Sequence, residues 1–302
     1  MIDIIIPVYN SFDFLDRALS SLVCQLNAGD FKVYIIDDAS TCDYDSIIDF
    51  YSKSLNIIYD RLDKNVGPGG ARKRGVDISS GKYIIFLDSD DIFASPLTVS
   101  DLFSFIEDGY DVVCSVVLEQ LDNGFNLYKN DNVGLHGKIY RRSFLSLNDI
   151  NFTGMRSNED NAFNSLIKLC GGKYGFLDRV TYFWCNNKKS ITRVDPFQNF
   201  IIDMNNYCSS ALWALNESIQ RNIFSNIELF CIEFFISIYN RYSSFDYQLV
   251  YDNINESFKD VYNIYDKYKS DDIDNVIINN ALYENFYSIV DDFHSFIEVM
   301  VK

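Results

Sequence analysis

The sequence has only two histidines, His136 and His294, and none of its seven cysteines forms a C-x-x-C pair. Structural zinc sites need several closely spaced Cys or His ligands, so this scarcity argues against a zinc protein. The cysteines are scattered along the chain, most of them among apolar residues. That distribution is typical of reduced, buried thiols, and we therefore expect a cytoplasmic protein.

Long apolar runs and excess positive charge are also missing. No run of about 18 apolar residues occurs, so no transmembrane helix is expected. The chain passes from Met1 straight into a strand-like pattern without a basic leader, so no signal peptide is expected. With 26 Lys and Arg against 43 Asp and Glu, the net charge is −17. This charge disfavours unaided binding to nucleic acid or to anionic lipid.

What is present is a regular alternation of short apolar runs and segments with helical periodicity. Apolar residues make up 48% of the 302 residues, which is ample for one large domain or two modest ones. A βαβ alternation predicts an α/β domain with a mostly parallel sheet and helices on both faces. The predicted strands are 2–8, 31–36, 55–59, 83–87 and 111–118, and the predicted helices are 12–26, 44–51, 69–79 and 97–107. Asp122-Asn123-Gly124 then predicts a hairpin turn built on the Asn-Gly pair.

The pattern changes near residue 194 to long helical stretches rich in Tyr and Phe. We therefore predict two domains, an α/β domain over residues 1–193 and a helical C-terminal domain over residues 194–302. The aromatic stripes are interpreted as helical core rather than as a ligand platform. The predicted helices cover residues 200–218, 227–242, 247–268 and 273–300.

A cluster of carboxylates follows the predicted strand 83–87, in the order Asp88-Ser89-Asp90-Asp91. Ligands of open α/β sheets gather beyond the carboxyl ends of the strands. Carboxylates packed there repel one another unless a hard cation such as Mg²⁺ or Mn²⁺ lies between them. The alternative is an ordinary acidic helix cap at Asp91.

Further motifs follow the other strands. Strand 2–8 ends in Pro7-Val8-Tyr9-Asn10, strand 31–36 leads into Asp37-Asp38-Ala39-Ser40, and helix 69–79 is preceded by Asn65-Val66-Gly67-Pro68-Gly69-Gly70-Ala71-Arg72. Downstream lie Gly137-Lys138-Ile139-Tyr140-Arg141-Arg142, Asn158-Glu159-Asp160 and Ser190-Ile191-Thr192. In order and spacing this series resembles the family 2 glycosyltransferases, inverting enzymes of GT-A fold that use a nucleotide-diphosphate sugar. The resemblance covers about residues 1–193.

The resemblance implies a donor site and a metal site. Asp38 resembles the family aspartate that accepts the uracil N3–H; the alternative is that it only caps a turn or a helix. Arg72, at a helix start, is expected to meet a phosphate. The implied metal ligands for Mn²⁺ or Mg²⁺ are Asp88 and Asp90, with Ser89 turned away from them on an extended backbone. The full implied donor-binding set is Pro7, Val8, Tyr9, Asp38, Gly67, Arg72, Asp88 and Ser89.

The resemblance also implies a catalytic pair. Asp160 matches the general base that deprotonates the acceptor hydroxyl, and Glu159 is its neighbour in the same motif. The alternative is that both carboxylates only complement a helix dipole. Two interpretations of His136 stay open: it lines the acceptor site, or it is an ordinary strand-end residue.

The sequence departs from the family pattern in three places. Cys185 stands where the family often has Arg, and Asn187 where it has His or Asn. A phosphate-binding Arg is therefore absent there, and Lys188 or Lys189 is the candidate replacement. Lys73 replaces the family's Asn after the motif Arg.

The resemblance implies a metal-dependent transfer from a UDP-sugar to an acceptor hydroxyl, with a cell-surface glycan as the leading acceptor. Phage-type glycosylation of a hydroxylated DNA base is an alternative function. Alternative locations are the inner face of the membrane and, for a phage-encoded protein, the host cytoplasm. A sugar-1-phosphate nucleotidyltransferase would need a Gly-rich, Arg-containing loop after the first strand, where Tyr9-Asn10-Ser11-Phe12 stands instead. A non-catalytic nucleotide-sugar-binding module is disfavoured by the intact carboxylates. The sequence leaves open whether the protein forms a homo-oligomer through the helical domain.

Overall fold

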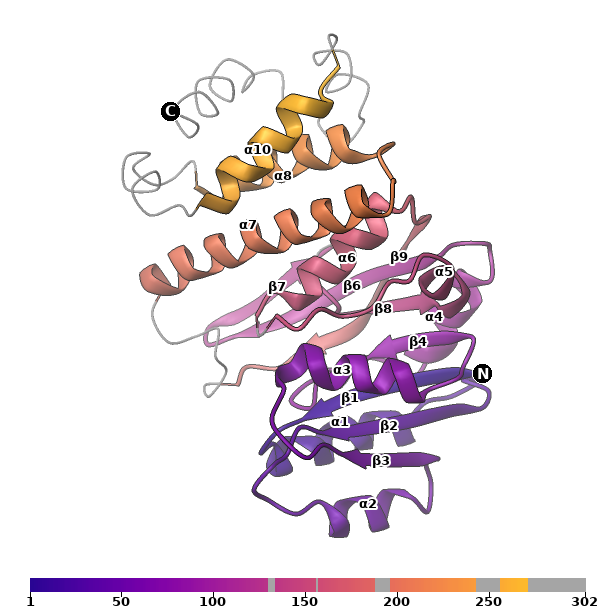
Figure 1. Ribbon diagram of the computed structural model, residues 1–302. Coiled ribbons are helices and arrows are strands. Elements are labelled where there is room, and N and C mark those ends of the chain that lie inside the picture. The colour runs from indigo at the N-terminus through magenta and orange to yellow at the C-terminus, as the bar shows by residue number, and fades with distance from the viewer. Residues whose placement is uncertain (130–133, 156, 188–195, 243–255, 271–302) are drawn as a thin grey trace. The chain divides into compact units, whose positions relative to one another are not determined.

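The computed structural model describes residues 1–302 except 130–133, 156, 188–195, 243–255 and 271–302 (Figure 1). The chain divides into two compact units, Met1–Asn164 with Gly172–Lys189, and Ser165–Gly171 with Ser190–Lys302. The predicted helix 273–300, the first part of 247–268, the Ser190-Ile191-Thr192 motif, Lys188 and Lys189 lie outside the described residues. The predicted domain boundary at residue 193 also falls there and stays a prediction.

The first unit is built on a mixed sheet of nine strands in its described residues, ordered β3-β2-β1-β4-β8-β6-β9-β5, with β7 paired to β6. The four strands β3, β2, β1 and β4 run parallel, and β8 is antiparallel to both β4 and β6. This matches the predicted α/β class. The strands are β1 (Ile2–Val8), β2 (Phe31–Asp37), β3 (Ile57–Arg61), β4 (Tyr83–Phe86), β5 (Ile92–Phe93), β6 (Val112–Leu121), β7 (Gly124–Tyr128), β8 (Lys138–Arg141) and β9 (Tyr174–Trp184).

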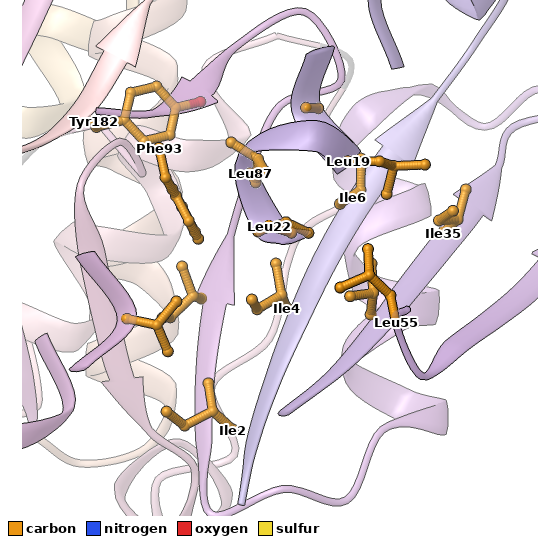
Figure 2. Packing of buried hydrophobic residues seen from close by; sticks show 14 of the residues in the cluster. Ile2, Ile4, Ile6, Leu19, Leu22, Ile35, Leu55, Leu87, Phe93 and Tyr182 are labelled. Carbon is orange, nitrogen blue, oxygen red and sulfur yellow. The ribbon is translucent and has the colours of Figure 1, made fainter. Parts of the chain in front are cut away.

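Helices cover both faces of the sheet because its central strands are apolar on both sides. In β1, Ile4 and Ile6 belong to the core cluster that includes Leu19 and Leu22, as Figure 2 shows, whereas Ile5 meets the opposite helix, α3. Fully burying each such side chain contributes about 1.5–3 kcal/mol. The helices of this region are α1 (Phe12–Val23), α2 (Asp45–Tyr51), α3 (Gly67–Ile78), α4 (Thr98–Ile106), α5 (Arg142–Leu147) and α6 (Glu159–Leu169).

The hairpin between β6 and β7 confirms the predicted turn but shifts its centre by one residue. Leu121 pairs with Gly124, so the loop consists of Asp122 and Asn123. Gly124 takes a φ of 134°, a conformation that favours glycine. The Asn-Gly pair therefore lies across the end of the turn instead of forming its two central residues.

The helical unit contains α7 (Pro196–Gln220), α8 (Ile227–Tyr242) and α10 (Glu256–Tyr268). Its aromatic residues form a core, as predicted: Phe234, Phe235 and Phe258 are buried and their rings lie 5.3–6.0 Å apart. Across the described ranges, no helix is both long enough and apolar enough to span a bilayer.

Gly75 in α3 sets how closely this helix packs on the sheet. A Cβ there would lie 2.4 Å from Ile5 Cγ2 and 3.3 Å from Ile36 Cγ1, both on fully buried side chains. We expect Gly75→Ala to lower the free energy of unfolding, because overpacking costs about 1–3 kcal/mol and exceeds the helix-propensity gain of up to about 1 kcal/mol. Urea unfolding measures the change. Gly154→Ala, whose Cβ meets no atom within 4 Å, is the control and should be neutral; a Gly75→Ala protein more stable than wild type would contradict this packing.

Candidate active site

The carboxylates after β4 lie on a turn, which corrects the expected extended backbone. Strand β4 ends at Phe86, and the Asp91 N–H donates to the Asp88 carbonyl at 3.1 Å. Such a turn brings its first and fourth residues together, so Asp91, and not Asp90, lies beside Asp88. The ligand atoms of Asp88, Asp91 and His136 all lie within 4.8 Å of one another.

Asp90 points to a different partner. Its Oδ2 accepts a hydrogen bond from Asn187 Nδ2 at 2.9 Å, and its carbonyl oxygen lies 3.4 Å from Arg17 Nη2. Among the described residues Asp90 is outside the three-residue group. Its role as a metal ligand with Asp88 stays a prediction, as does donor binding by Ser89, which occupies the second position of the turn.

Asp91 is a buried carboxylate with two local hydrogen bonds. Tyr182 Oη donates to it at 2.7 Å and the Cys185 N–H at 2.8 Å. Burial raises the pKa of Asp91 to about 7, and the nearby Asp88 charge adds to the increase while His136 opposes it. Cys185, where the family often has Arg, therefore contributes through its backbone. Asp91 was visible in the sequence as a carboxylate, but only the turn shows that it pairs with Asp88.

His136 lies beside the acidic turn, which consists of Asp88-Ser89-Asp90-Asp91. Its Nε2 is 3.3 Å from Asp88 Oδ2 and 3.9 Å from Asp91 Oδ2, and its ring lies 4.8 Å from that of Tyr182 and 5.0 Å from that of Trp184. Burial lowers the pKa of His136, but the Asp88 carboxylate raises it and the net shift is upward. The sequence left this histidine open; the structure makes it part of the site.

Arg72 joins two carboxylates that are distant in sequence. Its Nη2 lies 2.6 Å from Asp88 Oδ1 and its Nη1 2.5 Å from Glu159 Oε1. The guanidinium is buried, and its Nε has no hydrogen-bond partner among the described residues. Burial raises the pKa of Asp88, but Arg72 lowers it, and the net pKa lies well below its usual range. The predicted contact of Arg72 with a phosphate stays a prediction; in this structure its terminal nitrogens donate to carboxylates.

The glycine motif makes room for this arrangement. A Cβ on Gly69 would lie 2.7 Å from Glu159 Cγ, so a larger residue would push the carboxylate of α6 away from α3. Gly67 begins α3 with a φ of 84°, which favours glycine. At this motif, the structure shows a close approach of the Glu159 side chain to the backbone of α3.

Asp38 holds the beginning of α3. Its two carboxylate oxygens accept the N–H groups of Val66 at 2.7 Å and Gly67 at 2.8 Å, and the side chain is buried. The helix-cap alternative is thus observed, and the contact to uracil stays a prediction. Nearby, the Asp38 N–H donates to the Val8 carbonyl at 2.9 Å, and Tyr9 beyond Pro7 and Val8 is 51% exposed.

Several basic side chains on α3 and α5 pair with acceptors of the protein itself. Lys73 contacts Asp77 at 2.7 Å and Arg74 contacts Asp60 at 2.8 Å. Arg142 donates to the Gly81 carbonyl at 2.5 Å and lies 3.4 Å from the buried Asp3. Arg142, at the end of the Gly137–Arg142 motif, therefore contributes to the fold around the sheet.

The side-chain oxygens of the acidic turn are suited to binding a hard divalent cation. Two carboxylates lie side by side at Asp88 and Asp91, and burial, with a smaller contribution from the Asp88 charge, raises the pKa of Asp91 to about 7. Carboxylate oxygens are the ligands that Mn²⁺ and Mg²⁺ prefer. A ring nitrogen of His136 belongs to the same group of possible ligand atoms.

Solved structures share this fold. Residues 1–349 of Staphylococcus aureus TarS, in complex with UDP-GlcNAc, superpose with a TM-score of 0.59 at 20% identity, covering 88% of this chain and 89% of that one. The Pyrobaculum calidifontis mannosyltransferase PcManGT, in complex with GDP-Man and Mn²⁺, gives a TM-score of 0.59 at 13% identity, covering 100% and 86%.

Curated relatives match shorter stretches. The poly(ribitol-phosphate) β-N-acetylglucosaminyltransferase TarS of S. aureus strain Mu50 is 27% identical over 204 residues, 62% of this chain and 35% of that protein. A poly(ribitol-phosphate) β-glucosyltransferase of Bacillus spizizenii is 38% identical over 97 residues, 31% of this chain and 15% of that protein. The chain therefore matches only about a third or less of these relatives' length. The family model described as glycosyl transferase family 2 matches residues 3–177, more than half of the sequence. The chain belongs to glycosyl transferase family 2, and its α/β region has the GT-A fold.

Proposed function

We propose that this protein transfers a sugar from a UDP-sugar to an acceptor hydroxyl with inversion at the anomeric carbon. The observation that supports this most directly is the Arg72 bridge, which holds Asp88 of the acidic turn and Glu159 of α6 within 2.6 Å of one guanidinium. Donor-side and acceptor-side motifs, 71 positions apart in the sequence numbering, thus meet in one site. UDP is favoured because TarS is similar to this chain in sequence and in fold.

On the donor side, Tyr9 offers an exposed ring at the end of β1 on which a base can stack. Asp38 holds the first N–H groups of α3 beside it. A divalent cation, Mn²⁺ or Mg²⁺, would be held by Asp88 and Asp91 or by the motif pair Asp88 and Asp90. When bound, it supplies Lewis-acid stabilisation of the departing diphosphate.

On the acceptor side, the two carboxylates of α6 have different surroundings. Glu159 is buried and paired with Arg72, so it holds the helix start in place. Asp160 is partly exposed and makes no ion pair within the described ranges. We assign Asp160 as the base: it takes the proton of the acceptor hydroxyl as that oxygen attacks the anomeric carbon and the nucleoside diphosphate leaves.

The proposed acceptor is a hydroxyl of a cell-surface glycan, assembled on the cytoplasmic side. Two similar proteins carry names that specify poly(ribitol-phosphate) as their acceptor. A donor screen that reads the released nucleoside diphosphate, with and without a polyol-phosphate acceptor, tests the proposal. Absence of release from any sugar nucleotide would refute it.

Metal dependence is tested by chelation and by substitutions in the acidic turn. EDTA should abolish UDP release, and Mn²⁺ or Mg²⁺ should restore it. Asp91→Asn should weaken Mn²⁺ binding at least about 10-fold in calorimetry, since a charged donor atom is lost. Ser89→Ala, a change in the same turn without a carboxylate, is the control and should bind Mn²⁺ as wild type does. Full turnover in the chelator would contradict metal dependence.

Asp38→Ala should affect both the nucleotide and the fold. It leaves two buried N–H groups of α3 without their acceptor, at a cost of about 1–3 kcal/mol each. We expect a lower thermal midpoint together with weaker UDP binding, measured by calorimetry below that midpoint. Lower stability with unchanged UDP affinity would show that Asp38 acts only as the cap of α3.

The assignment of Asp160 as the base predicts that substitutions of Asp160 and of its neighbour Glu159 have different effects. Asp160→Asn should lower kcat by about 10²–10⁴-fold with UDP affinity unchanged, because only the proton acceptor is lost. Glu159→Gln should lower the thermal midpoint instead, because it removes one charge from the buried Arg72 pair. A dead Glu159→Gln enzyme beside an active Asp160→Asn enzyme would reverse the assignment.

A further inference from the structure

Aromatic side chains connect the acidic turn with an exposed hairpin of the same compact unit. Strands β7, β6 and β9 lie side by side (Figure 1), and Val117 of β6 pairs with both Tyr128 and Tyr182. Paired residues share one face of a sheet, as do residues two positions apart, so Trp184 lies on that face too. The Tyr128 ring is 6.3 Å from the Trp184 ring, which is 5.0 Å from the His136 ring. We call Tyr128, Trp184 and His136 the aromatic row.

The outer end of the aromatic row is accessible and held in place. Tyr128 is 36% exposed, and Trp184 is partly exposed. The Tyr128 hydroxyl donates to Glu119 Oε2 at 2.7 Å, and Glu119 is itself buried. This bond restrains a ring on an exposed strand. A surface that is already ordered loses less entropy when a ligand binds to it.

The inner end of the aromatic row lies beside the residue assigned as the base. Asn164, one turn after Asp160 in α6, donates through Nδ2 to the Gly134 carbonyl at 3.0 Å and to the Asp160 carbonyl at 3.2 Å. The short segment that carries His136 is thereby bonded to the first turn of α6, and these residues all belong to the first compact unit. His136 also lies 3.3 Å from Asp88. The inner end of the row is therefore next to both the acidic turn and the start of α6.

We propose that the aromatic row binds an uncharged pyranose ring of the acceptor, with Tyr128 and Trp184 as specificity-determining residues. This inference rests on the proposed function. One face of a pyranose presents mainly C–H groups, which pack against the electron-rich face of an aromatic ring. An open-chain polyol has no such flat apolar face. The Glu119 and Asp88 carboxylates beside the row also disfavour an acceptor that carries phosphate groups.

Tryptophan fluorescence tests binding to the row directly. The chain has two tryptophans, so Trp213→Phe in α7 leaves Trp184 as the only one. In this variant of the full chain with UDP present, we titrate cellobiose, lactose and N,N′-diacetylchitobiose. At least one of these sugars should change the Trp184 emission in a saturable way. Ribitol phosphate, titrated to the same concentration, should not.

Substitutions in β7 test the row during turnover. Tyr128→Ala should raise the KM of the best pyranoside acceptor by about 3- to 10-fold, as expected for one lost aromatic contact, and leave the UDP Kd unchanged. Tyr128→Phe keeps the ring and should stay close to the wild-type KM. The matched control is Phe125→Ala, which removes an exposed aromatic residue from the opposite face of the same strand. It should match wild type.

Three results would overturn the proposal. One is that no pyranoside changes the Trp184 emission more than ribitol phosphate does. Another is a wild-type acceptor KM in Tyr128→Ala. The third is a weaker UDP-sugar Kd with an unchanged acceptor KM, which would assign the row to the donor sugar. If the wild-type protein releases no nucleotide from any donor, the proposed function fails, while the fluorescence titration still decides whether the row binds a pyranose.

Discussion

The buried guanidinium of Arg72 is the contact on which the candidate site depends. It pairs with Asp88 and Glu159, and so ties together α3, the turn after β4 and the first turn of α6. Removing one partner of a buried ion pair leaves an uncompensated charge and costs about 3–5 kcal/mol. The arrangement also requires a glycine at position 69, because the Glu159 side chain occupies the space that a larger residue would fill. A change at Arg72 or Gly69 would therefore disturb contacts among all three of these elements.

The acidic turn brings two carboxylates, Asp88 and Asp91, close together. The Asp88 carboxylate has Arg72 and His136 as partners, whereas Asp91 accepts two hydrogen bonds from neutral donors and lies farther from His136. Burial and the nearby carboxylates raise the pKa of Asp91 to about 7, although His136 opposes the increase. Such a cluster is suited to a cation or to a substrate that brings one. This cluster supports the proposed Mn²⁺ or Mg²⁺ dependence.

The sequence alone determined the elements and the family. Apolar runs predicted β1 and α8 with the bounds that the structure shows, because strand and helix periodicity are local properties. The order of motifs identified the family. Only the tertiary structure decided which polar groups meet: Asp91 beside Asp88 instead of Asp90, Arg72 on Glu159, and Asp38 on the start of α3. These partners lie on separate elements or depend on the dihedral angles of a single turn, and neither can be read from spacing along an assumed extended strand.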